Sequence, residues 1–371
     1  MEPMEQVWAT RAAAAEAAVT RRHLRRLWSV PGTQLGVVGW PSSSSERRFG
    51  VWNYWWQAHL LDCLVDAQVR APDAARGIRI ARQIRGHRLR NNGFWTNDYY
   101  DDMAWFALAL ERSGRLTGVT RPKALKVLSN QLINAWVPED GGGIPWRKED
   151  QFFNAPANGP AGIFLARYDR LRRAQQTADW IDETLIDPIT HLVFDGIKGG
   201  SMVRAQYTYC QGVVLGLETE LALRTDSPRH ARRVHRLVSA VREHMAPNGV
   251  IVGTGGGDGG LFGGILARNL AIVATALPGE PDRDREARRF ARRLILDSAQ
   301  AAWDNAASVD GLPLFSASWD RAAEMPQPGG KHALSVDGAI DSSEIPERDL
   351  SGQLAGWMLM EAAHTVSGPE V

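Results

Sequence analysis

The stretch NDYYDDMAWFALAL, residues 97–110, decides the fold, because a polar and aromatic start leads directly into an almost continuous apolar run. A helix that is apolar on all sides is typical of a buried position. Five other stretches show the same order, a polar, aromatic or glycine-rich start before a helical pattern: NYWWQ at 53–57, NAPANG at 154–159, YTYCQG at 207–212, GGGDGGLFGG at 255–264 and DLSGQ at 349–353. Together these six stretches predict six inner helices.

The remaining helical segments have arginine-rich faces, as in RHARRVHRLVSAVREH at 229–244, which is typical of helices that face solvent. Apolar residues with the period of a helix predict twelve helices in all. They cover residues 7–28, 52–70, 73–89, 99–113, 120–136, 157–171, 172–186, 207–224, 228–245, 261–277, 283–303 and 349–366. The alternation of inner and outer helices predicts an all-α, single-domain (α/α)6 barrel over residues 1–371, with all inner N-termini at one end.

Two other all-α architectures fit the sequence less well. A solenoid of helix pairs would repeat about every 34–47 residues, whereas the six polar starts are irregularly spaced and differ from one another. Two stacked bundles would need a linker, and no low-complexity stretch divides the chain. The longest stretch without helical periodicity, 304–348, is expected to be an irregular segment near the barrel, over its mouth or along its side.

The composition excludes several classes of protein. A hydrophobic content of 44% is that of a globular protein with a large core, and a formal net charge of +1 gives no basis for binding nucleic acid. The sequence contains no continuous apolar run of about 20 residues, so no membrane span is expected. Cys63 and Cys210 lie within helical patterns and are expected to be buried thiols. The N-terminus lacks the apolar core of a secretory signal, which favours a cytoplasmic location, or a secreted one if the chain is a mature form.

Asp101 and Asp102 are the candidate catalytic residues. Two acids in a first helical turn can simply favour the positive end of the helix dipole, but these two follow two tyrosines, precede an apolar helix and have no basic residue nearby. Glycoside hydrolysis requires a pair of carboxyl groups. Adjacent residues fit the short carboxyl separation of a retaining mechanism more naturally than the longer one of an inverting mechanism. Their like charges also raise the pKa of one acid, which keeps it protonated.

Several motifs together resemble glycoside hydrolase family 76, whose members are endo-α-1,6-mannanases. The run NDYYDDMAWFALAL resembles the signature of that family. Six further stretches are similar to other motifs of the family in the same order: NYWWQAHLLDCLVDA from 53, GGGIPWR from 141, NAPANGPAGIFLARYDR from 154, VFDGIKGG from 193, YTYCQGVVLGLETEL from 207 and GLFGGILARNLAIV from 260. The likeness covers about residues 50–275. The chain departs from the family at Gly264, where a lysine is frequent, and at Cys210, where an asparagine is more usual.

The resemblance implies an (α/α)6 barrel and a retaining mechanism, with Asp101 as the nucleophile and Asp102 as the acid/base. It implies a polysaccharide or oligosaccharide of α-1,6-linked mannose as substrate. No cofactor is expected, and no metal site, because the histidines are dispersed without ligand spacing. The sequence does not determine the oligomeric state.

Substrate-binding residues are expected around the six polar starts. Fourteen tryptophans are an unusual number, and several lie in polar, glycine-rich surroundings where they can stack on sugars. The glycines of 255–264 are expected to let the backbone approach the substrate, because this stretch lacks the lysine and the preceding strand of a phosphate-binding loop. The candidates are Trp56, Trp95, Asn97, Tyr99, Tyr100, Trp146, Asn158, Tyr207, Gln211, Asp258 and Arg268, the last with the catalytic acids as its expected partners.

The leading hypothesis is a retaining endo-acting glycoside hydrolase that cleaves α-1,6-mannosidic linkages in mannan-type polysaccharide. A transglycosylase or an α-glucan hydrolase would use the same scaffold and the same acids. A non-catalytic carbohydrate-binding protein is a further alternative, although the intact pair of aspartates argues against it. A sugar isomerase would be expected to use histidines as proton carriers, and none of the six polar starts contains one.

Overall fold

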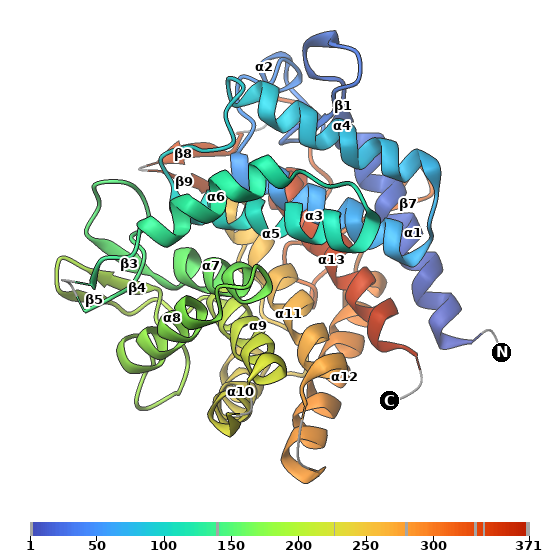
Figure 1. Cartoon of the computed structure of the whole chain (residues 1–371). Helices are drawn as coiled ribbons and strands as arrows, with labels where there is room; N and C mark the ends of the chain where they lie inside the picture. The colour runs from blue at the N-terminus through green and yellow to red at the C-terminus, as the bar shows by residue number, and fades with distance from the viewer. Residues whose placement is uncertain are drawn as a thin grey trace.

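A computed structural model describes residues 3–138, 141–225, 227–278, 281–329, 332–336 and 338–368. Six inner helices form a closed ring (Figure 1). They are α3 (Tyr54–Arg70), α5 (Tyr100–Thr117), α7 (Ala155–Arg167), α9 (Thr208–Arg224), α11 (Phe262–Ala276) and α13 (Leu350–Val366). Each contacts the next in this order, and α13 returns to α3. This ring confirms the predicted single-domain (α/α)6 barrel.

Six outer helices surround the ring. Five of them pack against the preceding inner helix, and α1 packs against α13. They are α1 (Met4–His23), α4 (Ala74–Arg90), α6 (Pro122–Asn134), α8 (Leu171–Thr184), α10 (Pro228–Ala240), which η3 (Val241–Met245) extends, and α12 (Pro281–Asp304). In α10 the buried residues His230, Val234, Leu237 and Val238 recur with the helical period, so one face of the helix packs inward.

Local sequence signals explain several helix ends. Pro122 and Pro228 occupy first helical positions, where no backbone N–H is required. Asn154 caps α7, since its side chain accepts a hydrogen bond from the Ala157 N–H at 3.1 Å. Gly118 ends α5 in the left-handed conformation, with φ of 75°. Such signals place most predicted helix boundaries within a few residues of the observed ones.

Two expectations about secondary structure are corrected. The first helix ends at His23 and not at residue 28, because Leu24 and Arg25 pair with the strand Leu35–Gly36. The segment 304–348 is not irregular throughout, because it contains two hairpins and a short 3-10 helix. Strands of two or three residues are too short to show a period of two in the sequence.

The described residues contain these short strands: β1 (Leu24–Arg25), β2 (Leu35–Gly36), β3 (Phe152–Asn154), β4 (Gly196–Lys198), β5 (Ser201–Val203), β6 (Ala307–Val309), β7 (Leu312–Leu314), β8 (Leu334–Val336) and β9 (Ala339–Asp341). The short helices are η1 (Leu27–Ser29), α2 (Ser44–Arg47), η4 (Gly257–Leu261) and η5 (Pro346–Arg348).

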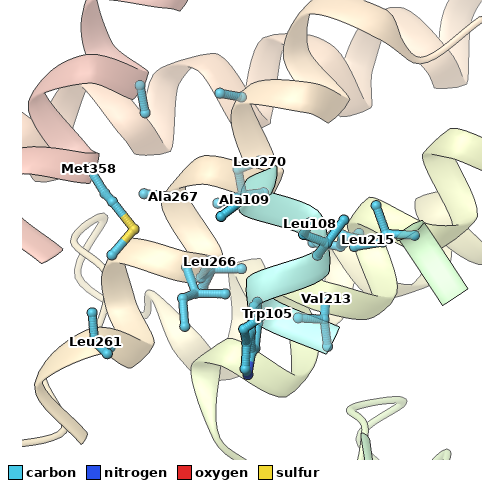
Figure 2. Packing of buried hydrophobic residues seen from close by; sticks show 14 of the residues in the cluster. Trp105, Leu108, Ala109, Val213, Leu215, Leu261, Leu266, Ala267, Leu270 and Met358 are labelled. Atoms are coloured by element: carbon cyan, nitrogen blue, oxygen red, sulfur yellow. The ribbon is translucent and has the colours of Figure 1, made fainter. Parts of the chain in front are cut away.

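The core lies within the ring and between its two layers. Figure 2 shows apolar side chains of α5, α9, α11 and α13 converging, among them Trp105, Leu215, Leu266 and Met358. The inner helices approach one another closely. A Cβ atom at Gly264 of α11 would lie 2.6 Å from the Cα atom of Ala355 in α13, so this approach requires glycine.

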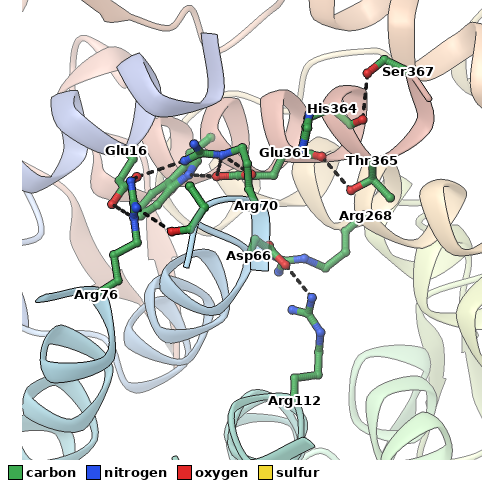
Figure 3. A network of polar contacts seen from close by, with 12 residues as sticks. Glu16, Asp66, Arg70, Arg76, Arg112, Arg268, Glu361, His364, Thr365 and Ser367 are labelled. Atoms are coloured by element: carbon green, nitrogen blue, oxygen red, sulfur yellow. Dashed lines mark hydrogen bonds and ion pairs between the residues drawn. The ribbon is translucent and has the colours of Figure 1, made fainter. Parts of the chain in front are cut away.

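A buried network of ion pairs attaches α1 to the ring (Figure 3). Glu16 of α1 accepts from Arg70 of α3 at 3.0 Å and from Arg76 of α4 at 2.8 Å, and Arg70 also pairs with Glu361 of α13 at 2.9 Å. Removal of one member would leave the others charged and buried, which is costly. The network therefore fixes how four helices pack.

One stretch of the described residues, Gly257–Ala276, is long and apolar enough to cross a membrane by length and composition. The sequence prediction of no membrane span did not anticipate it. The stretch consists of η4 and the inner helix α11, and 61% of its apolar window is buried within the protein. Core helices commonly have this composition, and α11 is such a helix.

Candidate active site

A cavity of about 640 Å³ opens where the inner helices begin, and both Asp101 and Asp102 line it. The two acids occupy the first turn of α5, directly after the start residue Tyr100. Residues from several other starts complete the lining: Asn53, Tyr54, Trp55, Tyr99, Trp105, Trp146, Phe152, Asn154, Asp195, Tyr207, Tyr209, Thr254, Gly255, Gly256, Asp258, Gly259, Phe262 and 338–342. The prediction that polar helix starts gather at one end of the barrel is thus confirmed.

Asp101 accepts two hydrogen bonds that favour its ionised form. Trp146 donates its indole N–H to Oδ2 at 2.8 Å, and the backbone N–H of Asp102 donates to Oδ1 at 2.6 Å. Burial nevertheless raises the pKa of Asp101 to about 7 against the effect of the two hydrogen bonds, with smaller contributions in the same direction from the charges of Asp258 and Asp195. Asp101 therefore changes its charge near neutral pH.

Asp102 is less well supported as an anion than Asp101. Its carboxylate accepts one side-chain hydrogen bond, from the amide of Asn97. Burial, followed by the adjacent charge of Asp101, raises the pKa of Asp102 well above its ordinary value. Asp101 has two hydrogen-bond donors to its charged form, whereas Asp102 has one side-chain donor. When the pair holds one proton, this difference favours a protonated Asp102 and an ionised Asp101.

Asp258 links two walls of the cavity. Its Oδ1 accepts from the indole N–H groups of Trp55 at 3.0 Å and Trp56 at 2.8 Å, and its Oδ2 accepts from the backbone N–H of Ile340 at 2.7 Å. Burial raises the pKa of Asp258 to about 6 in spite of these three hydrogen bonds. A carboxylate with so many donors is held in one orientation.

Asp195 is a fourth carboxyl group in the cavity, and sequence analysis did not select it. Burial raises its pKa to about 6, and the Sγ atom of Cys210 lies 3.9 Å from its Oδ1. The segment VFDGIKGG contained this residue, but an aspartate before glycine is also a common turn residue. Its position became evident only when β4 and α9 were brought together.

Aromatic rings form the sides of the cavity. Tyr99 and Trp146 meet edge to face, with centroids 5.1 Å apart and an angle of 71° between the rings. On another side, Tyr209 and Phe262 stack at 3.8 Å and 7°. Tyr207 is 37% exposed beside them. Flat apolar faces next to carboxyl groups suit sugars, which present both C–H faces and hydroxyl groups.

Four of the predicted substrate-binding residues, Tyr99, Trp146, Tyr207 and Asp258, line the cavity. Asn97 and Trp56 do not line the cavity, but they donate hydrogen bonds to two residues that do: Asn97 to Asp102 and Trp56 to Asp258. These six residues are therefore part of the site or of its support.

Two predicted amides brace loops instead of lining the cavity. Asn158 is fully buried, and its amide exchanges hydrogen bonds with the backbone N–H and C=O of Ile144, both at 2.8 Å. Gln211 is also fully buried and does the same with Val193, at 2.8 and 3.0 Å. The second amide N–H of Asn158 donates to the C=O of Asn154 and that of Gln211 to the C=O of Tyr207, so the structure places both amides on backbone groups outside the cavity lining.

Two aromatic residues near the acids pack elsewhere. Trp95 stacks on Phe106, with centroids 6.2 Å apart, and the guanidinium of Arg88 lies 4.8 Å from its ring. Tyr100 packs against the core and does not line the cavity. Residues at a helix start point in different directions, about 100° apart per position, so proximity in sequence did not place these rings in the site.

Arg268 does not meet the catalytic acids, contrary to the prediction. Its guanidinium pairs with Asp62, at 2.8 Å, and with Asp66. It lines a separate cavity of about 420 Å³ formed largely by residues farther along the inner helices, including Arg112 and Glu220. Arg268 lies six residues beyond the first residue of α11, which places its side chain well below the mouth of the barrel.

The sequence also failed to indicate Trp55, Tyr209 and the segment 338–342. Trp55 and Tyr209 belong to the motifs NYWWQ and YTYCQG, from which the neighbouring residues Trp56 and Tyr207 had been selected. The segment 338–342 had no local signal, because only long-range contacts bring it to the cavity. Among the residues that the structure describes, no group of three or more His, Cys, Asp or Glu side chains is suited to hold a metal ion.

Comparison with known proteins agrees with this geometry. The family model of glycosyl hydrolase family 76 matches residues 11–348. The GH76A α-1,6-mannanase from Salegentibacter sp. HEL1_6 is similar, with 27% identity and a TM-score of 0.80, and the match covers 97% of this chain and 99% of that one. A variant of that enzyme, inactivated at two consecutive aspartates, has been solved in complex with α-1,6-mannotriose.

The Lin0763 protein from Listeria innocua is similar as well, with 25% identity, a TM-score of 0.78 and 96% coverage of both chains. No curated protein matches the chain. The family model extends over most of the barrel and includes both candidate acids. The chain therefore belongs to glycosyl hydrolase family 76.

Proposed function

We propose that the protein is a retaining endo-hydrolase of α-1,6-mannosidic bonds in mannan-type polysaccharide. The observation that carries this proposal is the unequal support of two adjacent half-buried carboxyl groups, with two donors to Asp101 and one side-chain donor to Asp102. Retaining hydrolysis requires one ionised and one protonated carboxyl group in the resting enzyme. The complex of the Salegentibacter variant with α-1,6-mannotriose supports the choice of substrate.

In the first step of the proposed mechanism, the Asp101 carboxylate attacks C1 of the mannosyl unit. The C1–O bond to the leaving sugar breaks, and Asp102 donates its proton to the departing oxygen. The indole N–H of Trp146 and the backbone N–H of Asp102 favour the ionised form of Asp101 that attacks. The products of this step are a mannosyl ester on Asp101 and a shortened chain.

In the second step, Asp102 accepts a proton from water as the water oxygen attacks C1. The ester bond to Asp101 breaks, the carboxylate leaves with its electron pair, and both acids return to their starting states. Two inversions at C1 give net retention of the α configuration.

Proton NMR during hydrolysis of α-1,6-mannotetraose tests the proposal. The expected first product is the α-anomer, with β-anomer growing in only by mutarotation, and Asp101→Asn is expected to abolish turnover in an otherwise folded protein. Initial β-anomer would refute retention. Hydrolysis of an α-glucan but not of the mannoside would refute the choice of substrate, and products longer than the substrate would indicate transfer to sugar instead of water.

A further inference from the structure

The β8–β9 hairpin crosses the mouth of the barrel from one wall to the other. Midway along β9, the Ile340 N–H binds Asp258 before α11, and just beyond the base of the hairpin Ser343 donates its N–H to Asp349 before α13 at 3.1 Å. At its tip, Gly338 contacts Tyr99 before α5 and Trp146 before α7. In a ring with the order α3, α5, α7, α9, α11 and α13, α11 lies opposite α5, and α13 lies opposite α7. The hairpin thus spans the diameter of the mouth, on the same side of the molecule as the β3–β5 sheet (Figure 1).

The contact at the tip is close and depends on glycine. A Cβ atom at Gly338 would lie 2.6 Å from Oη of Tyr99 and 2.9 Å from Cη2 of Trp146, so any larger residue requires the tip or these rings to shift. The φ angle of Gly338 is +92°, which other residues adopt only with strain. Trp146 is also the hydrogen-bond donor to Asp101, so the tip rests directly on the support of the proposed nucleophile.

We infer that this hairpin is a bar across the cleft that discriminates against long chains, with Gly338 as the specificity-determining contact. The inference rests on the proposed function and narrows it. Residues 338–342 line the same cavity as Asp101 and Asp102, so a bound saccharide must lie against the hairpin. A short oligosaccharide can enter by its end, whereas a polymer that continues on both sides of the cleaved bond requires the bar to lift. Internal bonds of a long chain are therefore cleaved more slowly than the bonds of a short one.

Shortening the hairpin tests the inference. Deletion of residues 336–339 leaves the paired residues Leu334 and Asp341 joined by two residues, a length that hairpin turns accept. The measured quantity is the ratio of kcat/KM on α-1,6-mannan to kcat/KM on α-1,6-mannotetraose. We expect this ratio to rise on the order of tenfold, because a long chain no longer has to displace the tip from Tyr99 and Trp146.

A second variant retains the length of the hairpin. Gly338→Val introduces a branched side chain at positive φ against Tyr99 and Trp146, so the tip can no longer rest on the opposite wall. The ratio is expected to rise in the same direction, while Ile340 and its hydrogen bond to Asp258 stay in the chain. The thermal melting midpoint of each variant shows whether it folds. If the deletion impairs folding, Gly338→Val still tests the inference.

The β4–β5 hairpin provides a matched control. It rises from the same end of the barrel, but a Cβ atom at Gly199 or Gly200 in its tip would meet nothing within 4 Å. Gly200→Val places the same branched side chain at a positive φ of +79° in a tip that touches nothing, and it is expected to leave the ratio unchanged. An unchanged ratio in both β8–β9 variants would overturn the bar while leaving the proposed hydrolysis intact. Failure of the native chain to cleave either substrate would instead overturn the proposed function, and the inference with it.

Discussion

Trp146 affects how readily Asp101 ionises, because its indole N–H binds the charged form of that carboxyl group. The pKa of Asp101 is about 7, so the kcat/KM of the native protein on α-1,6-mannotetraose is expected to fall as the pH drops below that value. Replacement of Trp146 by Phe removes the donor and raises the pKa. The acid limb of the pH profile should therefore move to higher pH, and kcat/KM at pH 7 should fall by about tenfold or more.

Trp136→Phe is the control for this substitution. Trp136 precedes the same loop, but its ring lies 4.5 Å from the guanidinium of Arg173 and does not line the cavity. Its replacement should leave the profile in place. An acid limb that stays put, or moves to lower pH, in Trp146→Phe would show that the indole does not stabilise the ionised acid.

The individual residues show which parts of the site a sequence can predict. Asp101 and Asp102 were found because acids before an apolar helix are unusual, and Tyr99 and Trp146 because aromatic residues in polar loops are unusual. Asn158 and Gln211 have the composition of ligand-binding residues but satisfy the backbone of neighbouring loops. A buried amide and a ligand-binding amide cannot be distinguished until the position of the loop is known.

At the scale of the helices, glycine sets the distance between α11 and α13. Gly264→Ala would place a Cβ atom 2.6 Å from the Cα atom of Ala355, where backbone and not a flexible side chain is in the way. The two helices must then separate, and we expect a loss of about 1–3 kcal/mol in the free energy of unfolding. Urea denaturation followed by circular dichroism measures this loss.

Gly77→Ala is the matched control, since Gly77 lies within the outer helix α4 and a Cβ atom there would meet nothing within 4 Å. Alanine is the better helix former by about 0.5–1 kcal/mol, so this variant should gain stability. The two substitutions are chemically identical but are expected to differ in sign. Equal changes in the free energy of unfolding would mean that the close contact between α11 and α13 does not determine the effect of Gly264→Ala.

The helices were the most predictable elements, and the short strands were the least. Inner helices are apolar on every side and outer helices on one, so the two layers differ in sequence. The pairing of Leu24 and Arg25 with β2 overrides a helical pattern that continues to residue 28, which no local signal reveals. The β8–β9 hairpin has the same origin in long-range contacts, and it was therefore expected only as an irregular segment near the barrel.

At the scale of the whole molecule, the barrel gathers Asp101, Asp102, Asp195 and Asp258 around one cavity, where each is only partly exposed. Burial raises the pKa of each in the folded protein. Each acid therefore holds its proton more tightly in the folded protein than in the unfolded chain. Ionisation of such a group disfavours folding, so the site that supports catalysis also lowers stability near neutral pH.

The double substitution Asp101→Asn and Asp102→Asn is expected to stabilise the protein above pH 7. Native stability should fall as the pH rises from about 4, where carboxyls of the unfolded chain ionise, through about 7, the pKa of Asp101. The amides do not titrate, so the gain in the free energy of unfolding should be small at pH 4 and reach roughly 2–4 kcal/mol at pH 8. Urea denaturation at the two pH values measures it.

Asp98→Asn provides the control for this stability test. Asp98 precedes the same helix, but its side chain is 80% exposed beside Lys148, and its replacement should change stability little at either pH. If the double variant gained as much at pH 4 as at pH 8, its added stability would come from packing or hydrogen bonding and not from relief of buried charge. A gain confined to pH 8 would show that ionisation of the two acids lowers the free energy of unfolding of the native protein. The same unfavourable ionisation keeps one of the two acids protonated at neutral pH.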